Sequence, residues 1–424
     1  MHDLRLLREP MDELRAGLER RGVLQGLENT LSRAAALESE RRSLIQQVEE
    51  RKAERNSNSQ EVARRKRSGE DASDLVGRGR LLGDDISRFE SRLREVETEV
   101  ETILLELPNL TDEGVPAGGE SENRVLRSWG EPRAAGGIAP HWETGERLGL
   151  LDLARGAKIS GSGFVVFRGR GARLVRGLIN FMLELHADEH GYEEVWVPTL
   201  VTRAAMTGTS QLPKFEDDMY AVDGGDQFLI PTAEVPVTNL YREEMLEASM
   251  LPAAFCAYTP CFRREAGAAG KDTRGLLRVH QFDKVELVRY AEPEESAAEH
   301  DRLTTHAETV LRRLELPYRV LLLAAGDTGF ASTRTYDLEV FAPGVGKWLE
   351  VSSSSNFGDF QARRANIRYR PAGGGKPRFI HTLNASGLAL PRIIAALLEH
   401  GLQPDGSVLL PESLHRHVGL DRLA

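Results

Sequence analysis

Apolar residues recur three and four positions apart through much of the first quarter of the chain, and this spacing predicts long helices with one apolar side. The stronger seam, in residues 75–107, consists of Leu75, Leu82, Ile86, Phe89, Leu93, Val96, Val100, Ile103 and Leu107. A weaker seam, in residues 27–67, consists of Leu37, Leu44, Val48 and Val62. The polar break at residues 68–71 lets the second helix return antiparallel to the first. We therefore predict a helical hairpin whose arms are on the order of 60 Å long at about 1.5 Å per residue.

The pattern changes after Pro108, which ends the second helix, and a turn-rich segment follows at residues 114–119. We therefore expect two domains, a helical one at residues 1–112 and one that mixes helices and strands at residues 113–424.

Early in the second domain, residues 172–190 predict an amphipathic helix and residues 192–198 predict a strand that ends in Pro198. Proline is tolerated at a sheet edge or at an interface. This unit suits a dimer contact or ordinary core.

Residues 262–286 predict two strands joined by a long loop at residues 266–275, which is too long for a tight turn and is a candidate substrate-contacting loop. Alternation places one set of polar and aromatic side chains on a single face, namely Arg278, His280, Phe282, Lys284 and Glu286. The opposite face carries Leu277, Val279, Val285 and Leu287, while Arg263 and Glu265 extend the polar face from the preceding strand. An aromatic ring between cations suits a nucleotide, but a solvated face of an antiparallel sheet fits the spacing equally well.

Three other segments carry polar groups at the ends of predicted strands. Thr232 and Glu234 suit either a helix cap or recognition of an ammonium group. Glu350 precedes a run of serines, which suits either a turn or a site for Mg²⁺ and phosphates. Arg392 follows Pro391 at the start of a predicted helix, where the helix dipole disfavours a cation unless an anion is present. That misfit favours phosphate binding by Arg392.

Composition limits the classes of protein that the chain can represent. Its 424 residues are 40% hydrophobic and 28% charged, which leaves room for two or three domains with a sizeable core. No apolar run reaches membrane-spanning length and the N-terminus lacks the apolar core of a signal peptide, so we expect no membrane partner and a cytoplasmic location. The two cysteines, Cys256 and Cys261, have no companions, so we expect neither a zinc site nor a structural disulfide.

The net charge of −10 argues against nonspecific coating of nucleic acid, although a local basic patch is compatible with RNA binding. Such a patch lies on the predicted hairpin and consists of Arg41, Arg42, Arg51, Lys52, Arg55, Arg64, Arg65, Lys66 and Arg67. By pattern alone, a solvated spacer or dimerisation helix is the commoner outcome, and a phosphate-binding arm is the alternative.

Taken together, these segments resemble the class II aminoacyl-tRNA synthetases, and specifically the bacterial seryl-tRNA synthetase family, over nearly the whole chain. The three class signatures correspond to residues 172–198, 262–286 and 387–392. The sequence motifs typical of the seryl family lie at residues 232–234, 274–286, 350–357 and 360–370. The resemblance implies an α+β fold, with an antiparallel β-sheet flanked by helices and preceded by a coiled-coil arm. It also implies a homodimer in which the arm grips the long variable arm of serine tRNA, which reverses the preference for a mere spacer.

The resemblance also implies a role for each matching position. The serine-binding residues are Thr232, Ala233, Glu234, Arg263, Glu286, Asn384 and Ser386. The ATP-binding residues are Arg263, Arg264, Glu265, Arg278, Val279, Phe282, Glu350, Val351, Ser352, Ser353 and Arg392, with Glu350 and Ser353 as ligands of Mg²⁺. Arg263, Glu286 and Arg392 are the catalytic residues. To the arm cations from Arg41 to Lys66 the resemblance adds Lys271 and Arg274 as tRNA contacts.

The implied activity is that of a serine–tRNA ligase. Serine and ATP form seryl-adenylate and pyrophosphate, and the seryl group then moves to the 3′ end of tRNA(Ser) and, where it is present, of tRNA(Sec). Two rivals are a relative that loads a carrier protein, against which the long arm argues, and a non-catalytic adaptor, against which the retained Arg263, Glu286, Glu350 and Arg392 argue.

The chain departs from the usual family pattern at three positions. Gly163 stands where arginine is usual, and Ser210 and Ala385 stand where glycine is usual or frequent. None of the three is a predicted ligand, and we expect Ser210 to stiffen a loop beside the serine site.

Overall fold

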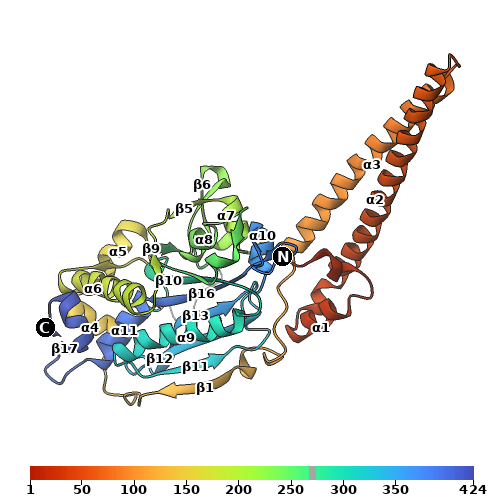
Figure 1. The fold of residues 1–424 in the computed structure, drawn as a ribbon. Helices are drawn as coiled ribbons and strands as arrows, with labels where there is room; N and C mark the ends of the chain where they lie inside the picture. The colour runs from red at the N-terminus through yellow and green to blue at the C-terminus, as the bar shows by residue number, and fades with distance from the viewer. Residues whose placement is uncertain (267–273) are drawn as a thin grey trace. The chain divides into compact units, whose positions relative to one another are not determined.

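The computed structural model describes residues 1–266 and 274–424. Its contacts divide into two compact units, one of residues His2–Leu107 and the other of Met1 together with Pro108–Ala424 (Figure 1). Among the described residues, no helix has both the length and the apolar character needed to cross a membrane.

The first unit confirms the predicted pair of long helices. Helix α2 spans Leu24–Arg67 and α3 spans Ser73–Glu106, which corresponds to about 66 Å and about 51 Å at about 1.5 Å per residue. Short elements that the apolar spacing did not predict precede them, η1 at Leu4–Leu7 and α1 at Asp12–Arg20.

The seam between the two long helices is largely the predicted one. The buried side chains on α2 and α3 include Leu31, Ala34, Leu37, Leu44, Val48, Leu82, Ile86, Val96, Val100 and Leu104. Leu31, Ala34 and Leu104 were missing from the prediction, whereas Phe89, Leu93 and Ile103 are only half-buried. Asn58 Nδ2 donates a hydrogen bond of 2.8 Å to the Leu75 carbonyl and fastens the two helices near the turn.

An eight-stranded sheet forms the centre of the second unit, in the order β1-β11-β12-β13-β16-β10-β9-β4. Its strands span Arg124–Trp129, Tyr318–Leu322, Arg334–Ala342, Lys347–Asn356, His381–Ala389, Gln281–Ala291, Ala253–Phe262 and Glu193–Glu194 in that order. Every pairing is antiparallel except that of β4 with β9. The predicted antiparallel sheet is confirmed, but the strand expected at residues 192–198 is shorter than predicted, because β4 covers only Glu193–Glu194.

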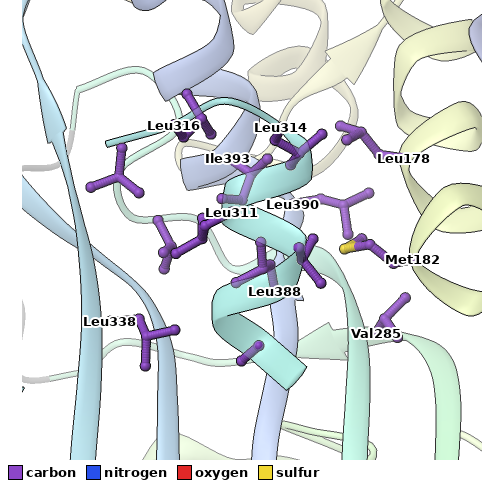
Figure 2. Close-up of a cluster of buried hydrophobic side chains, with 14 of the residues drawn as sticks. Leu178, Met182, Val285, Leu311, Leu314, Leu316, Leu338, Leu388, Leu390 and Ile393 are labelled. Carbon is purple, nitrogen blue, oxygen red and sulfur yellow. The ribbon is translucent and has the colours of Figure 1, made fainter. Parts of the chain in front are cut away.

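Helices α6 (Arg170–Glu184), α9 (Ser296–Arg313) and α11 (Leu390–His400) pack on one face of this sheet. The helix expected at residues 172–190 is therefore present, and it continues from α6 as one π-helical turn at Leu185–Glu189. Figure 2 shows Leu178 and Met182 of α6 and Leu311 of α9 meeting Val285 and Leu388 of the sheet. Burial of these side chains fixes which face of β10 is the inner one.

The opposite face is covered at one end by α8 (Glu234–Thr238) and α10 (Phe360–Ala365), where Val288 and Tyr290 of β10 are buried. Lys284 and Glu286 lie on the same face of β10, next to this covered region. The other elements of the unit are α4 (His141–Arg147), β2 (Leu151–Asp152), α5 (Leu153–Ser160), β3 (Val166–Phe167), β5 (Leu200–Thr202), α7 (Arg203–Gly208), β6 (Tyr220–Val222), β7 (Gln227–Leu229), β8 (Met245–Glu247), β14 (Arg368–Arg370), β15 (Arg378–Phe379), β17 (Val408–Leu409), α12 (Glu412–Val418) and β18 (Arg422–Leu423).

Strands β9 and β10 form the predicted antiparallel pair, but next to the connecting loop both stop short of the predicted positions. β9 ends at Phe262, and Glu265 adopts a left-handed φ of 50°, which a strand does not contain. Arg278 and His280 likewise precede β10. The side chains of Glu265, Arg278 and His280, together with that of Arg263, therefore project from segments next to the strand ends. The alternative of a solvated sheet face is wrong, because Lys284 is 5% exposed and Glu286 is 0% exposed.

Candidate active site

Two adjoining cavities open over the uncovered part of this sheet face. The first is lined by Arg263, Glu265, Leu276, Leu277, Arg278, Val279, Phe282, Lys284, Glu350, Val351, Ser386, Ala389, Pro391 and Arg392. The second is lined by residues that include Ser210, Thr232, Glu234, Arg263, Lys284, Glu350, Ser353, Asn384 and Ser386. Arg263, Lys284, Glu350 and Ser386 line both. Most of the predicted site residues from four separate segments are thus brought together.

A buried polar network forms the floor of the second cavity. Asn384 Nδ2 donates to Glu234 Oε2 and to Glu286 Oε1, each at 2.9 Å, and so joins two carboxylates from α8 and β10. Gln361 Nε2 donates to Glu234 Oε1 at 2.7 Å, and its own carbonyl oxygen accepts from the Thr382 hydroxyl at 2.7 Å. The network fixes the carboxylates in place before any ligand arrives.

Both carboxyl groups of this network are perturbed by their surroundings. Burial and, after it, the neighbouring Glu286 charge together raise the pKa of Glu234 to about 7, against the hydrogen bond from Gln361. Burial also raises the pKa of Glu286, against the charge of Lys284. A buried pair of carboxylates with one lysine therefore has room for another cation.

A β-bulge places the residues opposite Glu286. The β10–β16 register shifts so that Val285 pairs with Leu388 and Glu286 pairs with Ser386, which leaves Gly387 as the extra residue. A Cβ atom at Gly387 would come within 2.9 Å of His186 Nε2, so only glycine fits there without a shift. Asn384 and Ser386 precede the bulge and lie two residues apart on the regular part of β16, so both face the second cavity.

A second bulge between β12 and β13 explains how Glu350 and Ser353 share a cavity. Residues three apart in a regular strand point to opposite faces. Here Leu338 pairs with Ser352 and Glu339 pairs with Glu350, so Val351 is extra and the alternation is reset. Both side chains consequently line the second cavity.

The first cavity combines an aromatic ring with cations. Arg263 Cζ lies 5.1 Å from the centroid of the Phe282 ring, and Arg278 forms an ion pair with Glu265. Arg392 Nη1 donates to the Glu350 carbonyl at 2.6 Å, and Arg392 Nε donates to the Leu277 carbonyl at 3.3 Å. This cavity suits a planar base beside a chain of phosphates.

Some predicted residues lie outside both cavities. Ala233 is buried at the start of α8, and the hydroxyl of Ser352 is turned away to donate to the Ser386 carbonyl at 2.7 Å. Arg264 is exposed, and Arg274 lies over the Trp142 ring at 4.9 Å from its centroid. Lys271 lies outside the described residues. The assigned roles of all five stay predictions.

Sequence reasoning missed three groups that support the site. Lys284 was placed on the correct face but was given no role, although its period-2 spacing from Glu286 was a usable signal. Gln361 orients Glu234, and His141 Nε2 accepts a hydrogen bond of 3.0 Å from the Leu276 backbone N–H. Neither of these two carries a local pattern that points to the cavities.

The three departures from the family pattern have visible settings. Gly163 has a φ of 80°, and a Cβ atom there would lie 2.5 Å from the His280 ring. Ser210 has a left-handed φ of 72°, lines the second cavity and, within the described part of the chain, has a buried hydroxyl without a hydrogen-bond partner. Ala385 is fully buried in the core beneath the sheet. Of the two departures that are not glycine, Ser210 is the one whose backbone conformation favours glycine.

Most of the arm cations pair with carboxylates of the same unit. Arg41 lies 3.3 Å from Glu97, Arg51 lies 2.8 Å from Glu54, Lys52 lies 2.7 Å from Glu90, Arg64 lies 2.8 Å from Glu61, and Arg65 lies 3.2 Å from Asp74. Arg42, Arg55 and Lys66 are exposed and, among the described residues, have no carboxylate within salt-bridge distance. Arg67 is exposed as well, but its Nε donates to the Ala63 carbonyl at 3.2 Å, so Arg42, Arg55 and Lys66 are the predicted cations most available to an outside partner.

The sheet, its two bulges and the paired cavities agree with a family comparison. Residues 215–401 match the tRNA synthetase class II core domain (G, H, P, S and T). The second unit is therefore the core of a class II aminoacyl-tRNA synthetase.

Residues 1–111 match the seryl-tRNA synthetase N-terminal domain. The chain is 64% identical to a serine–tRNA ligase of Gemmatimonas aurantiaca, with 100% of both chains covered, and 52% identical to one of Geobacillus kaustophilus, with 99% of both covered. It belongs to the seryl-tRNA synthetase family, and it is an enzyme, an aminoacyl-tRNA synthetase. The predicted family and fold are confirmed.

Two solved structures are similar over the whole chain. The seryl-tRNA synthetase of Pyrococcus horikoshii, complexed with ATP, has a TM-score of 0.94 at 36% identity and is covered to 99%. The cytoplasmic serine–tRNA ligase of Naegleria fowleri, in complex with AMP, has a TM-score of 0.88 at 26% identity and is covered to 98%. In both cases 100% of this chain is covered.

Proposed function

We propose that this chain joins ATP and L-serine into seryl-adenylate with release of pyrophosphate, and then transfers the seryl group to the 3′ end of tRNA(Ser). The observation that carries the proposal is the bridge from Asn384 to the buried carboxylates Glu234 and Glu286, next to the cavity of Phe282 and Arg263. An amino acid held by the first group lies beside a nucleotide held by the second.

Serine is recognised through both of its polar ends. The Glu234 carboxylate receives the ammonium group beside Thr232, whose hydroxyl accepts hydrogen bonds from Lys284 Nζ and the Glu234 backbone N–H. Glu286 accepts the hydrogen bond of the side-chain hydroxyl. An amino acid without a hydroxyl, such as alanine, leaves buried Glu286 unpaired, and a loss of that kind can give discrimination of about 10⁴-fold.

In the first step a serine carboxylate oxygen attacks the α-phosphorus of ATP, a P–O bond forms, and the bond to pyrophosphate breaks. Arg263 holds the serine carboxylate and the α-phosphate, Arg392 binds the distal phosphates, and Phe282 stacks on the adenine, with Glu265, Arg278 and Val279 around it. No protein nucleophile takes part, so catalysis consists of positioning and neutralisation of charge.

Glu350 and Ser353 are the residues that would hold Mg²⁺. Their surroundings fit a hard cation, because the Oδ1 atom of Asp337, which pairs across the sheet with Ser353, is buried without a hydrogen-bond partner among the described residues. Burial and the charge of Glu350 raise the pKa of Asp337 well above its ordinary value. Mg²⁺ keeps several waters and binds phosphates, so two protein ligands suffice, and when bound it neutralises phosphate charge.

In the second step the 3′-terminal ribose hydroxyl of the tRNA attacks the seryl carbonyl, and AMP leaves. The helical domain at residues 1–112 holds the tRNA and the domain at residues 113–424 performs the chemistry, in a cytoplasmic homodimer. Selenocysteine tRNA, where it is present, belongs to the same proposal. A. aeolicus tRNASec has been solved in complex with the M. kandleri SerRS, which is 21% identical to this chain and therefore similar in fold alone.

The test is amino-acid-dependent exchange of pyrophosphate into ATP with each of the twenty amino acids, followed by charging of tRNA. We expect exchange with serine alone and charging of tRNA(Ser). Glu286→Gln should reduce serine-dependent exchange by at least about 100-fold. Glu308→Gln is the matched control, because Glu308 is a buried carboxylate on α9 that pairs with Arg127 at 2.7 Å and lines neither cavity. Absence of exchange with serine would refute the proposal.

A further inference from the structure

Lys284 is a buried cation at the boundary between the two cavities. It lies two residues before Glu286 on β10, is 5% exposed, and lines both cavities. A buried lysine is costly unless it is paired, so its contacts indicate what it does.

The ammonium group of Lys284 joins two predicted serine-binding residues. Its Nζ atom lies 2.5 Å from Glu286 Oε2 and donates to Thr232 Oγ1 at 2.8 Å. Thr232 Oγ1 also accepts the backbone N–H of Glu234 at 3.2 Å, so both lone pairs of this hydroxyl are filled. The substrate ammonium must therefore rely on the Glu234 carboxylate rather than on a free Thr232 lone pair.

The charges around Glu286 come from several elements. Lys284 lies on the same strand, Glu234 lies on α8, Arg263 follows β9, and the Cys261 thiol lies on β9. Asn384 contributes a neutral amide from β16. Of the two cations, Lys284 alone contacts Glu286 directly among the described residues. Without it, no cation would contact Glu286 among the described residues, and Glu286 would share the Asn384 amide with Glu234.

We propose that Lys284 is a positioning residue for serine selection, which keeps Glu286 ionised as an acceptor for the substrate hydroxyl and leaves Glu234 as the one carboxylate that the substrate ammonium neutralises. This inference rests on the proposed function. Before serine binds, the two carboxylates therefore differ, because Glu286 is already paired with the Lys284 ammonium group and Glu234 has no cation in contact with it among the described residues. Removing the lysine makes Glu286 take up a proton, and a neutral carboxyl group is less costly to leave unpaired.

The first test compares Lys284→Met and Lys284→Gln with the wild type in pyrophosphate exchange between pH 6 and 9. Above pH 8 the wild-type KM for serine should be flat, because Glu234 is then ionised. In both variants it should be at least about tenfold higher at pH 7.5 and should still fall as the pH rises, while the KM for ATP changes by less than about twofold. The preference for serine over alanine should shrink by at least about tenfold. Exposed Lys158→Met is the control substitution.

Glutamine keeps a hydrogen-bond donor but no charge, so it separates the two contributions. If Lys284→Gln behaves as the wild type, or if the pH profiles of both variants run parallel to that of the wild type, the charge of Lys284 does not set the state of Glu286 and the inference is wrong.

A second measurement needs no substrate. In thermal unfolding, Lys284→Met should lose more stability than the wild type as the pH rises from 6 to 9. Adding Glu286→Gln should remove that extra pH dependence. Equal pH dependence of the single and double variants would overturn the inference. Failure of the proposed function is a separate result, namely a wild-type enzyme without serine-dependent exchange.

Discussion

His141 Nδ1 lies 2.8 Å from Glu399 Oε1, and both side chains are fully buried. Because the other ring nitrogen of His141 accepts the Leu276 backbone N–H, Nδ1 carries the ring proton and donates it to Glu399. Glu399 also accepts the backbone N–H groups of His141 at 3.0 Å and Gly344 at 2.8 Å. This buried relay anchors the backbone of a segment whose side chains line the nucleotide cavity.

We predict that His141→Ala weakens nucleotide binding more than serine binding. The Leu276 N–H loses its acceptor and Glu399 loses one of its donors, which should lower the free energy of unfolding by about 1–3 kcal/mol. The KM for ATP should rise by about tenfold and the KM for serine by less than about twofold in pyrophosphate exchange. His415→Ala is a suitable control, since His415 bonds the Leu410 carbonyl near the C-terminus. An unchanged KM for ATP would show that the relay serves the core only.

Glu234 should make the folded enzyme less stable as the pH rises. Its pKa is raised to about 7, chiefly by burial, from an ordinary value of 4.5 in the unfolded chain. The stability that its protonated form contributes is fully present below pH 4.5 and is lost as the pH rises through 7, a change on the order of 3 kcal/mol. Glu234→Gln does not titrate, so its thermal unfolding should differ less between pH 5 and pH 8 than that of the wild type.

The same variant should lose serine-dependent exchange, because glutamine cannot neutralise the substrate ammonium. Glu308→Gln again serves as the control for removal of one buried carboxylate from the unit. If wild type and Glu234→Gln change in parallel between the two pH values, Glu234 is not the titrating group.

The unpaired arm cations should matter more for tRNA than the paired ones. Each alanine substitution of Arg42, Arg55 or Lys66 should raise the KM for tRNA in charging about two- to fivefold. It should also reduce the slope of log affinity for tRNA against log salt concentration by about one. Alanine substitutions of Arg51 and Arg65 should have smaller effects, because those side chains pair with Glu54 and Asp74. Pyrophosphate exchange should not change in any of these variants.

Deletion of residues 35–98, which removes most of the arm, tests the role of the arm as a whole. It should leave pyrophosphate exchange largely intact and strongly reduce the charging of tRNA. Equal loss of both activities would contradict the role assigned to the arm, and equal effects of paired and unpaired cations would contradict their ranking.

The sequence predicted which helices and strands form, and which face of a strand each side chain occupies, better than it predicted where those elements end. Alternation placed Lys284 and Glu286 on the correct face, because side-chain direction in a strand depends only on neighbouring residues. The predicted strand ends were wrong, because β9 ends at Phe262 and β10 begins only at Gln281. A left-handed conformation such as that of Glu265 depends on the surroundings of the residue as well as on its type.

The long-range partners were beyond local patterns. Asn384 contacts Glu234 across 150 positions, and His141 contacts Glu399 across 258. Only the family resemblance brought Asn384 into the serine site, and nothing in the spacing pointed to His141. Bulges are similarly hidden, because the extra residue at Val351 is visible only once the partner strand is known.

The four side chains shared by both cavities have a consequence for changing what the enzyme accepts. Arg263, Lys284, Glu350 and Ser386 each border the place of the amino acid and the place of the nucleotide. Substitutions at positions in contact are not additive, so the effects of two such changes cannot be summed from the single variants. A change of the amino-acid preference therefore requires substitutions to be chosen for both cavities together, and variants to be screened with the nucleotide bound.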